Sequence, residues 1–281
     1  MPTRPSLGPV WLVLLGVVSV QVGAGFAKSL FDAASPTTIV WLRLATSAVL
    51  LMLVARPALR GRSRSDWLVV VGFGAALGLM NWSIYQSFAR IPLGLAVTIE
   101  FAGPLLLAVA GSRRRGDLVW IGLAALGVVL LGFERTSLDP VGVLFALLAG
   151  AAWAAYILLS ARTGRRWPGL DGLAVASVVA LALLTPLMAG YAGELTGHIV
   201  LVGALVGVLS SVIPYSAELV ALRSLSPAVF GVLVSLDPAA AALAGWAVVG
   251  EVLSWVQWLA MACVVIASVG MTRSGRERLA V

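Results

Sequence analysis

Four ionisable side chains lie inside the apolar stretches of this 281-residue chain, and they are the first candidates for chemistry. They are Arg43, Glu100, Glu218 and Asp237. A charged side chain in hydrocarbon is costly unless it is paired or hydrated, so these residues are expected to bind a substrate or an ion. A carboxylate that loses its hydration takes up a proton more readily, which makes Glu100 the expected proton- or ammonium-binding group.

Arg43 is the expected partner of Glu100. Arg43 follows Pro36 by seven residues and Glu100 follows Pro92 by eight, which places both about 10–12 Å into helices that enter from the same side. One interpretation is a buried salt bridge that only fixes helix packing. The other is a charge pair that opens when Glu100 is protonated or when a zwitterionic substrate brings its carboxylate to Arg43.

Prolines accompany two of these carboxylates. Pro104 follows Glu100 by four residues, and Pro238 follows Asp237 directly. Proline removes a backbone donor and frees a carbonyl, so both helices are expected to kink or break near the midplane, where polar backbone can line a cavity. Pro214 is the third expected break.

The remaining candidates are one carboxylate and two aromatic pairs. Glu218 lies five residues before Arg223, so it is expected either to reach the membrane interface or to act as a gate or proton relay. Each aromatic pair has a three-residue spacing that puts both rings on one helix face, where they either pack against lipid and core or line a cavity. The pairs are Trp82 with Tyr85 and Trp153 with Tyr156.

The elements that position these side chains are membrane spans. The chain is 60% hydrophobic and 11% charged, with a mean hydropathy of +1.03. Ten apolar runs are each long enough to cross about 30 Å of hydrocarbon as a helix. They cover residues 9–28, 36–55, 67–88, 92–111, 117–133, 140–161, 170–190, 199–221, 227–249 and 253–272. The sequence therefore predicts an all-α integral membrane protein with ten transmembrane helices.

Basic residues explain the net charge of +7 without nucleic acid. With both termini in the cytoplasm, fifteen cations lie inside, against Lys28, Arg90 and Arg135 outside. Such an asymmetry follows the positive-inside rule and predicts a multi-pass protein of the inner or plasma membrane in that orientation. The lipid bilayer is the expected partner of the basic connections.

The small number of cysteine and histidine residues argues against an enzyme. The chain has one cysteine, Cys263, and one histidine, His198, so neither a nucleophile–base pair nor a metal cluster is expected. Nothing resembles a phosphate-binding loop or a nucleophile elbow. The sequence predicts no cofactor, no metal and no enzymatic activity.

An internal repeat organises the ten runs. A shift of 134 residues lays Gly16 on Gly150 and Pro104 on Pro238 without a gap. Because each unit holds five spans, an odd number, the second unit must be inverted relative to the first, and the site is expected near the midplane between the units. The predicted units are residues 1–134 and 135–281.

Glycines at four-residue spacing predict close helix packing. They are Gly74 with Gly78, and Gly203 with Gly207. These faces pack either inside one protomer or across a homodimer.

The segments around these candidates resemble a known transporter family. They are IPLGLAVTIEFAGPLLLAVAGSRRRGDLVW (residues 91–120), GAAWAAYILLSARTG (150–164), SSVIPYSAELVALRSL (210–225) and FGVLVSLDPAAAALAGWAVVGE (230–251). Together with the ten-span plan, they are similar to the EamA branch of the drug/metabolite transporter superfamily, and within it to RhtA-type threonine/homoserine exporters. The resemblance extends to Glu100, Glu218, Asp237 and Glu251, although such exporters usually carry glutamate where this chain has Asp237.

The resemblance implies that the protein exports small amino acids through the inner membrane by alternating access. It also implies that export is coupled to H+, which a proton-binding carboxylate would allow. An alternative is efflux of another metabolite or a drug-like cation, which an unpaired Glu100 in an aromatic cavity would suit. A membrane scaffold that transports nothing is the more distant alternative, and the short connections leave it little surface for partners.

Overall fold

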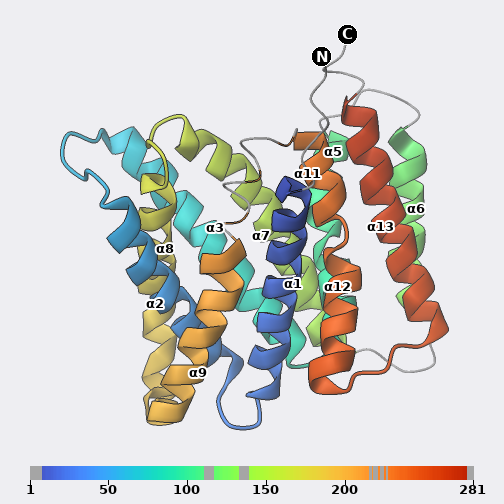
Figure 1. Ribbon diagram of the computed structural model, residues 1–281, viewed down its shortest axis with the longest axis horizontal. Helices are drawn as coiled ribbons and strands as arrows, with labels where there is room; N and C mark the ends of the chain where they lie inside the picture. The colour runs from blue at the N-terminus through green and yellow to red at the C-terminus, as the bar shows by residue number, and fades with distance from the viewer. Residues whose placement is uncertain are drawn as a thin grey trace.

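The computed structural model describes residues 8–110, 117–132, 139–214, 217, 221, 225 and 227–276, and the elements within them are helices (Figure 1). The first predicted unit contains α1 (Gly8–Ser29), α2 (Pro36–Ala55), α3 (Arg64–Phe88), α4 (Leu93–Glu100), α5 (Ala102–Ala110) and α6 (Asp117–Gly132). The second begins with α7 (Pro140–Gly164), α8 (Asp171–Leu184), the 3₁₀ turns η1 (Thr185–Gly190) and η2 (Ala192–Glu194), and α9 (Gly197–Gly207). It continues with the π-helical η3 (Val208–Val212), α11 (Pro227–Val234), α12 (Asp237–Ala244), the π-helical η4 (Gly245–Val249) and α13 (Trp255–Arg276).

These elements follow the ten predicted apolar runs. Within the described residues, six helices are long and apolar enough to cross a membrane, and four shorter apolar helices accompany them. The prediction of an all-helical membrane protein with ten helical segments is therefore confirmed.

Short polar signals set where the helices begin. Ser35 accepts a hydrogen bond from the Thr38 N–H at the start of α2, directly before Pro36 at the first helical position. Ser63 and Asp66 form a capping box at the start of α3. Each cap satisfies a backbone N–H that the helix itself leaves unpaired.

Two of the ten segments are broken in the middle, as the prolines predict. The first separates α4 from α5 at Phe101, and the second separates α11 from α12 at Ser235 and Leu236. Each break begins three residues before a proline, Pro104 in α5 and Pro238 in α12. Helix α11 begins and ends 134 residues after α4, so the breaks occupy equivalent places under the predicted shift.

The third predicted break, at Pro214, is instead a π-helical turn. In a regular α-helix the N–H of residue 214 would bond to the carbonyl of Ser210, but proline has no N–H to give. The chain widens into η3 over Val208–Val212 and remains helical through Pro214. The Ser210 carbonyl is thereby left for another donor.

The packing of the helices repeats under the same shift. Helix α1 packs against α11 and α12, and its equivalent α7 packs against α4 and α5. Helix α2 packs against α9, and α8 packs against α3 in the same way. The equivalent helices α6 and α13 pack against each other, as do α2 and α8.

The glycine faces are used inside the protomer. A Cβ added at Gly74 would lie 2.6 Å from the Ala176 carbonyl oxygen on α8, and one added at Gly207 would lie 2.6 Å from Cβ of Thr46 on α2. These contacts hold α3 against α8 and α9 against α2.

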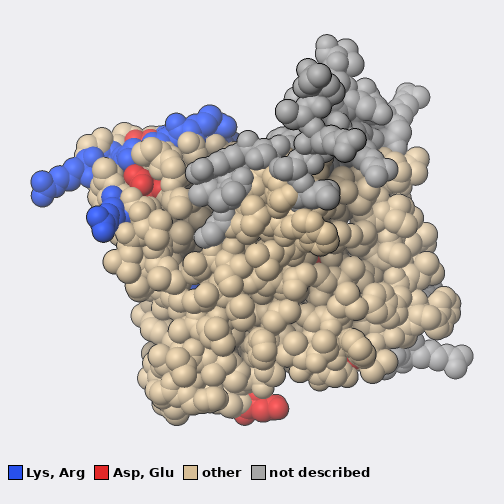
Figure 2. Space-filling model, viewed as in Figure 1, with Lys and Arg blue, Asp and Glu red and all other residues tan. Residues whose placement is uncertain are grey.

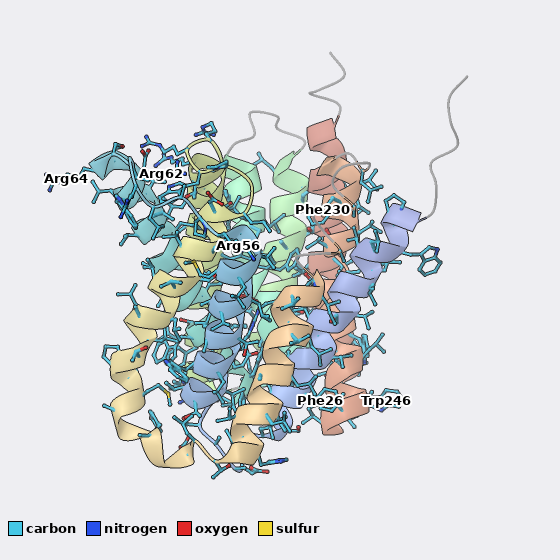
Figure 3. The ribbon with its side chains drawn as sticks, turned by 60° about the vertical axis from the view of Figure 1, so that its left-hand side comes forward. Phe26, Arg56, Arg62, Arg64, Phe230 and Trp246 are labelled. Carbon is cyan, nitrogen blue, oxygen red and sulfur yellow. The ribbon has the colours of Figure 1, made fainter. Side chains whose placement is uncertain are left out.

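Charge and apolar surface are separated along the molecule. In Figure 2 the charged side chains of the visible face gather at its upper and lower ends, and the band between them is almost entirely uncharged. Figure 3 shows Arg62 and Arg64 at one end, whereas Phe26 and Trp246 project from the side near the other. Trp246 is 64% exposed. Contiguous apolar surface of this kind is what a lipid-facing protein presents.

Candidate functional site

Glu100 is the last residue of α4 and is buried, with 8% of its surface exposed. Its charged neighbours are Asp237 on α12 and Arg43 on α2. The approach of α4 to α12 is close because Gly94 has no side chain: a Cβ there would lie 2.8 Å from Cβ of Ala242. Three of the four predicted ionisable residues therefore meet at the end of α4.

Arg43 is held by neutral groups beside Glu100. Its Nη2 donates to the Ser210 carbonyl at 3.1 Å, and its guanidinium lies 5.6 Å from the centroid of the Tyr85 ring. Its Nε is buried and has no hydrogen-bond partner among the described residues. The described part of the chain contains no ion pair between Arg43 and Glu100, so the closed salt bridge considered from the sequence is absent from this structure.

The Ser210 carbonyl is available to Arg43 because of Pro214. Pro214 has no N–H to donate to the Ser210 carbonyl, and the guanidinium of Arg43 donates to that carbonyl instead. The predicted proline thus acts on the site through a carbonyl four residues earlier.

Asp237 occupies the first turn of α12, where a negative charge is favoured by the helix dipole. The Nε2 group of Gln21 on α1 donates to its Oδ1 at 3.3 Å. Gln21 was not a predicted site residue. The signal was present in the sequence as an amide within the apolar run VSVQVGAG, but a neutral side chain does not stand out as a charged one does.

The four aromatic candidates divide between the site and the packing around it. Tyr85 is 1% exposed and lies against Arg43, and Trp153 packs edge-on against Phe101 at the α4–α5 break, with ring centroids 5.0 Å apart. Trp82 turns toward Phe145, and its Nε1 donates to Thr37 at 3.2 Å.

Tyr156 packs against Phe73, with ring centroids 5.0 Å apart, in a cluster that includes Trp167. The two residues of each predicted pair therefore have different neighbours, although they share a helix.

Backbone crosses backbone beside the break. Gly150 of α7 approaches the Glu100 carbonyl so closely that an added Cβ would lie 2.6 Å from its oxygen. Gly103 of α5 lies directly against the Gly150 carbonyl. Two glycines therefore let α7 cross the α4–α5 break at the residue that carries the buried carboxylate.

A second polar group lies at the far end of α4. Glu251 forms an ion pair with Lys28 at 2.6 Å and accepts a hydrogen bond from the Leu93 N–H at 2.9 Å. Lys28 also donates to the Ile91 carbonyl at 2.8 Å. Glu251 therefore caps the start of α4 and ties it to the end of α1.

Glu194 makes a similar connection between η2 and the start of α2. Its Oε2 accepts from the Ser35 N–H at 2.8 Å and from the Thr38 hydroxyl at 2.5 Å. Burial alone would raise the pKa of Glu194, but these hydrogen bonds to Thr38 and Ser35 outweigh it and leave the pKa below its ordinary value.

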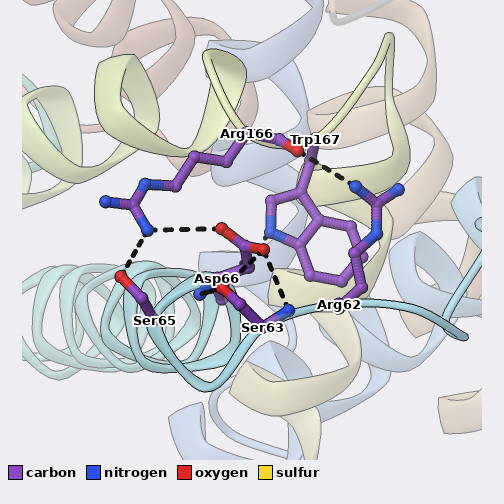
Figure 4. Close-up of polar contacts among 6 residues, drawn as sticks. All are labelled: Arg62, Ser63, Ser65, Asp66, Arg166 and Trp167. Carbon is purple, nitrogen blue, oxygen red and sulfur yellow. Dashed lines mark hydrogen bonds and ion pairs between the residues drawn. The ribbon is translucent and has the colours of Figure 1, made fainter.

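The opposite end of the molecule is joined by an arginine cluster (Figure 4). Arg62 lies 4.3 Å from the centroid of the Trp167 ring and donates to the Arg166 carbonyl at 3.0 Å. Arg166 in turn forms an ion pair with Asp66 at 3.2 Å. The cluster joins the α2–α3 connection to the α7–α8 connection.

Glu218, the fourth predicted ionisable residue, lies outside the described residues.

Comparison with known proteins identifies the family. The EamA-like transporter family matches residues 140–273. Threonine/homoserine exporters named RhtA, from Salmonella typhimurium and from Escherichia coli K12, are each 38% identical over 286 residues, covering 99% of this chain and 97% of the relative. The chain belongs to the EamA-like transporter family. It is therefore a member of a family of transporters rather than of enzymes.

Two further similarities were found. An uncharacterized inner membrane transporter, YedA of Escherichia coli K12, is 28% identical over 202 residues, covering 65% of this EamA-like chain and 63% of the relative. A crystal structure of a protein 18% identical in sequence covers 96% of this chain and 99% of its own, with a TM-score of 0.64. That likeness concerns the fold alone.

Proposed function

We propose that this protein exports threonine, homoserine or a similarly small amino acid across the inner membrane. The observation that carries the proposal is the 38% identity to proteins named threonine/homoserine exporters, which extends over 99% of the chain. The charges near Glu100 suit such a substrate, because an amino acid zwitterion brings one carboxylate and one ammonium.

In the proposed mechanism, Arg43 binds the carboxylate of the substrate through the donors that face away from Ser210. Glu100 binds either the ammonium of the substrate or a proton. Because one ionised carboxylate serves both, loading a proton displaces the ammonium, and the substrate leaves as the proton enters. Alternating access of this shared site then couples export to the inward flow of H+.

The proposed architecture has ten membrane spans in two inverted units, residues 1–134 and 135–281, with both termini in the cytoplasm. The equivalent helix breaks and the equivalent packing of α1 and α7 support the repeat. The positive-inside rule supports the orientation. A homodimer would need a surface other than the Gly74 and Gly207 faces, which are used inside the protomer.

The arginine beside Glu100 disfavours the alternative of cation efflux. A drug-like cation would require a site with net negative charge and open aromatic faces. Arg43 instead places a positive charge against the ring of Tyr85 and near Glu100.

Flux in proteoliposomes tests the proposal. Purified protein is reconstituted, a pH gradient is imposed, and movement of radiolabelled threonine and homoserine is compared with that of the Glu100→Gln variant at equal folded amounts. We expect gradient-driven flux in the original protein and its loss in the variant. The matched control is Asp32→Asn, which changes an exposed carboxylate in the α1–α2 turn and should leave flux unchanged. Folded original protein that moves neither amino acid would refute the proposed substrate.

A further inference from the structure

Gln21 is a buried amide whose two ends have different surroundings. Gln21 is 5% exposed. Its Nε2 donates to Oδ1 of Asp237, whereas its Oε1 is buried and accepts no hydrogen bond from the described residues. This orientation follows from chemistry, because an ionised carboxylate accepts hydrogen bonds and requires the NH₂ end of the amide to face it. Within the described part of the chain, the buried oxygen is therefore an acceptor without a donor.

A buried acceptor without a donor is unfavourable, so such groups are usually explained by a ligand or a function. Gln21 lies beside the proposed transport site, since its hydrogen-bond partner Asp237 is the charged neighbour of Glu100. Helix α12, which carries Asp237, packs against both α1 and α4. Gln21, Asp237 and Glu100 therefore gather around the start of α12 from three different helices.

These three side chains match the donors of a primary ammonium group. An alkylammonium ion has three N–H donors and no acceptor, as the side chain of lysine has. The carboxylates of Glu100 and Asp237 and the amide oxygen of Gln21 supply three acceptors. Arg43 is also a charged neighbour of Glu100 and supplies donors for a carboxylate.

We propose that Gln21 is a substrate-binding residue whose Oε1 accepts the third N–H of the amino acid's ammonium group, beside Glu100 and Asp237. The inference rests on the proposed function and deepens it, since it assigns the ammonium end of the substrate to particular atoms. The site then selects a primary amine. When a proton neutralises Glu100, the site loses one of the negative charges that hold the ammonium, and the substrate is released.

Two substitutions of Gln21 separate substrate binding from a structural role. Gln21→Met keeps the length of the side chain but removes both the acceptor and the donor. Gln21→Glu keeps an acceptor oxygen but replaces the donor to Asp237 with a second negative charge. If Oε1 binds the substrate, the KM for threonine should rise about tenfold or more in Gln21→Met and stay within about threefold in Gln21→Glu. If Gln21 only anchors Asp237, Gln21→Glu should be the worse variant, because it sets two carboxylates against each other.

The measurements are threonine KM in proteoliposomes and the rise in unfolding temperature of the detergent-solubilised protein as threonine is added. Ser19→Ala is the matched control, because Ser19 is a buried polar residue of α1 that bonds to the Leu209 carbonyl on η3 instead. It should leave KM unchanged. A normal KM in Gln21→Met, or a Gln21→Glu variant worse than Gln21→Met, would overturn this inference while leaving the exporter in place. Original protein that neither binds nor moves threonine would overturn the proposed function and this inference together.

Discussion

At the scale of single residues, the charges of the central cluster determine how proton and substrate compete in the proposed mechanism. Arg43 contributes one positive charge, and Glu100 and Asp237 contribute two negative charges when both are ionised. Protonation of Glu100 makes the cluster neutral. Ionisation of Glu100 gives the cluster one net negative charge, which an ammonium group can balance. The proposed exchange of one proton for one zwitterion therefore moves one net positive charge inward per cycle, so the membrane potential should drive it as well as the pH gradient.

The Lys28–Glu251 pair should stabilise the fold. The side chains of Lys28 and Glu251 are 17% and 11% exposed. Glu251→Ala leaves the Lys28 ammonium and the Leu93 N–H without their partner. We expect a loss of roughly 1.5–3 kcal/mol in the free energy of unfolding. Lys28→Met combined with Glu251→Gln should lose less than the sum of the single changes, as measured by thermal unfolding in detergent. Additive effects would show that the two side chains do not interact.

Glu194 should make stability depend on acid pH. Its pKa in the folded protein lies below its ordinary value, so it contributes stability above the pKa of an unfolded glutamate, about 4.3, and loses it as the pH falls through the folded pKa. Thr38→Val removes the shorter of its two hydrogen bonds. The unfolding temperature should therefore fall less steeply between pH 5 and pH about 3 in the variant than in the original protein. Parallel pH profiles for the two proteins would contradict this role.

The sequence reveals these residues unequally. Arg43, Glu100 and Asp237 stand out because a charge in an apolar run needs a reason. Gln21 does not stand out, because its side chain is neutral. Lys28, which pairs with Glu251, does not stand out either, because lysine is common near the end of a helix. The absence of an ion pair between Arg43 and Glu100 also has no sequence signal, since it depends on the Ser210 carbonyl freed by a proline on another helix.

At the scale of helices, the α4–α5 break is built by a proline on one segment and a glycine on its neighbour. Pro104 frees the Glu100 carbonyl, and Gly150 lets α7 pass against that carbonyl without a side chain between them. Pro104 predicts the break from local sequence alone. The need for glycine at 150 follows only once α7 is known to cross there, because that contact joins distant parts of the chain.

Gly150→Ala should therefore destabilise the protein and impair transport. Its Cβ would lie 2.6 Å from the Glu100 carbonyl oxygen, so α7 or the break must shift, at a cost of roughly 1–3 kcal/mol. Gly122→Ala is the control, because nothing lies within 4 Å of an added Cβ at that helical position. It should keep or raise the unfolding temperature, since alanine favours a helix over glycine. Equal effects of the two substitutions would show that the crossing is not tight.

At the scale of the whole molecule, the two ends are fastened by different chemistry. The α2–α3 and α7–α8 connections meet through arginines and Trp167, whereas the opposite end is joined by carboxylates that accept from Lys28, Ser35 and Thr38. In the proposed alternating-access mechanism each end opens in turn, so these contacts would break and reform in every cycle. The arginine-rich end is also the one that the positive-inside rule assigns to the cytoplasm.

Labelling of single cysteines tests that orientation. The only native cysteine, Cys263, is buried, and replacing it by alanine gives a background without thiols. Arg60→Cys then places a thiol in the exposed α2–α3 connection, and Gly193→Cys places one in the exposed η2 turn at the opposite end. A membrane-impermeant maleimide should label position 193 in intact cells and position 60 only in inverted membrane vesicles. The reverse pattern would place the arginine cluster outside, and labelling of both positions from one side would refute the separation of the two ends across the membrane.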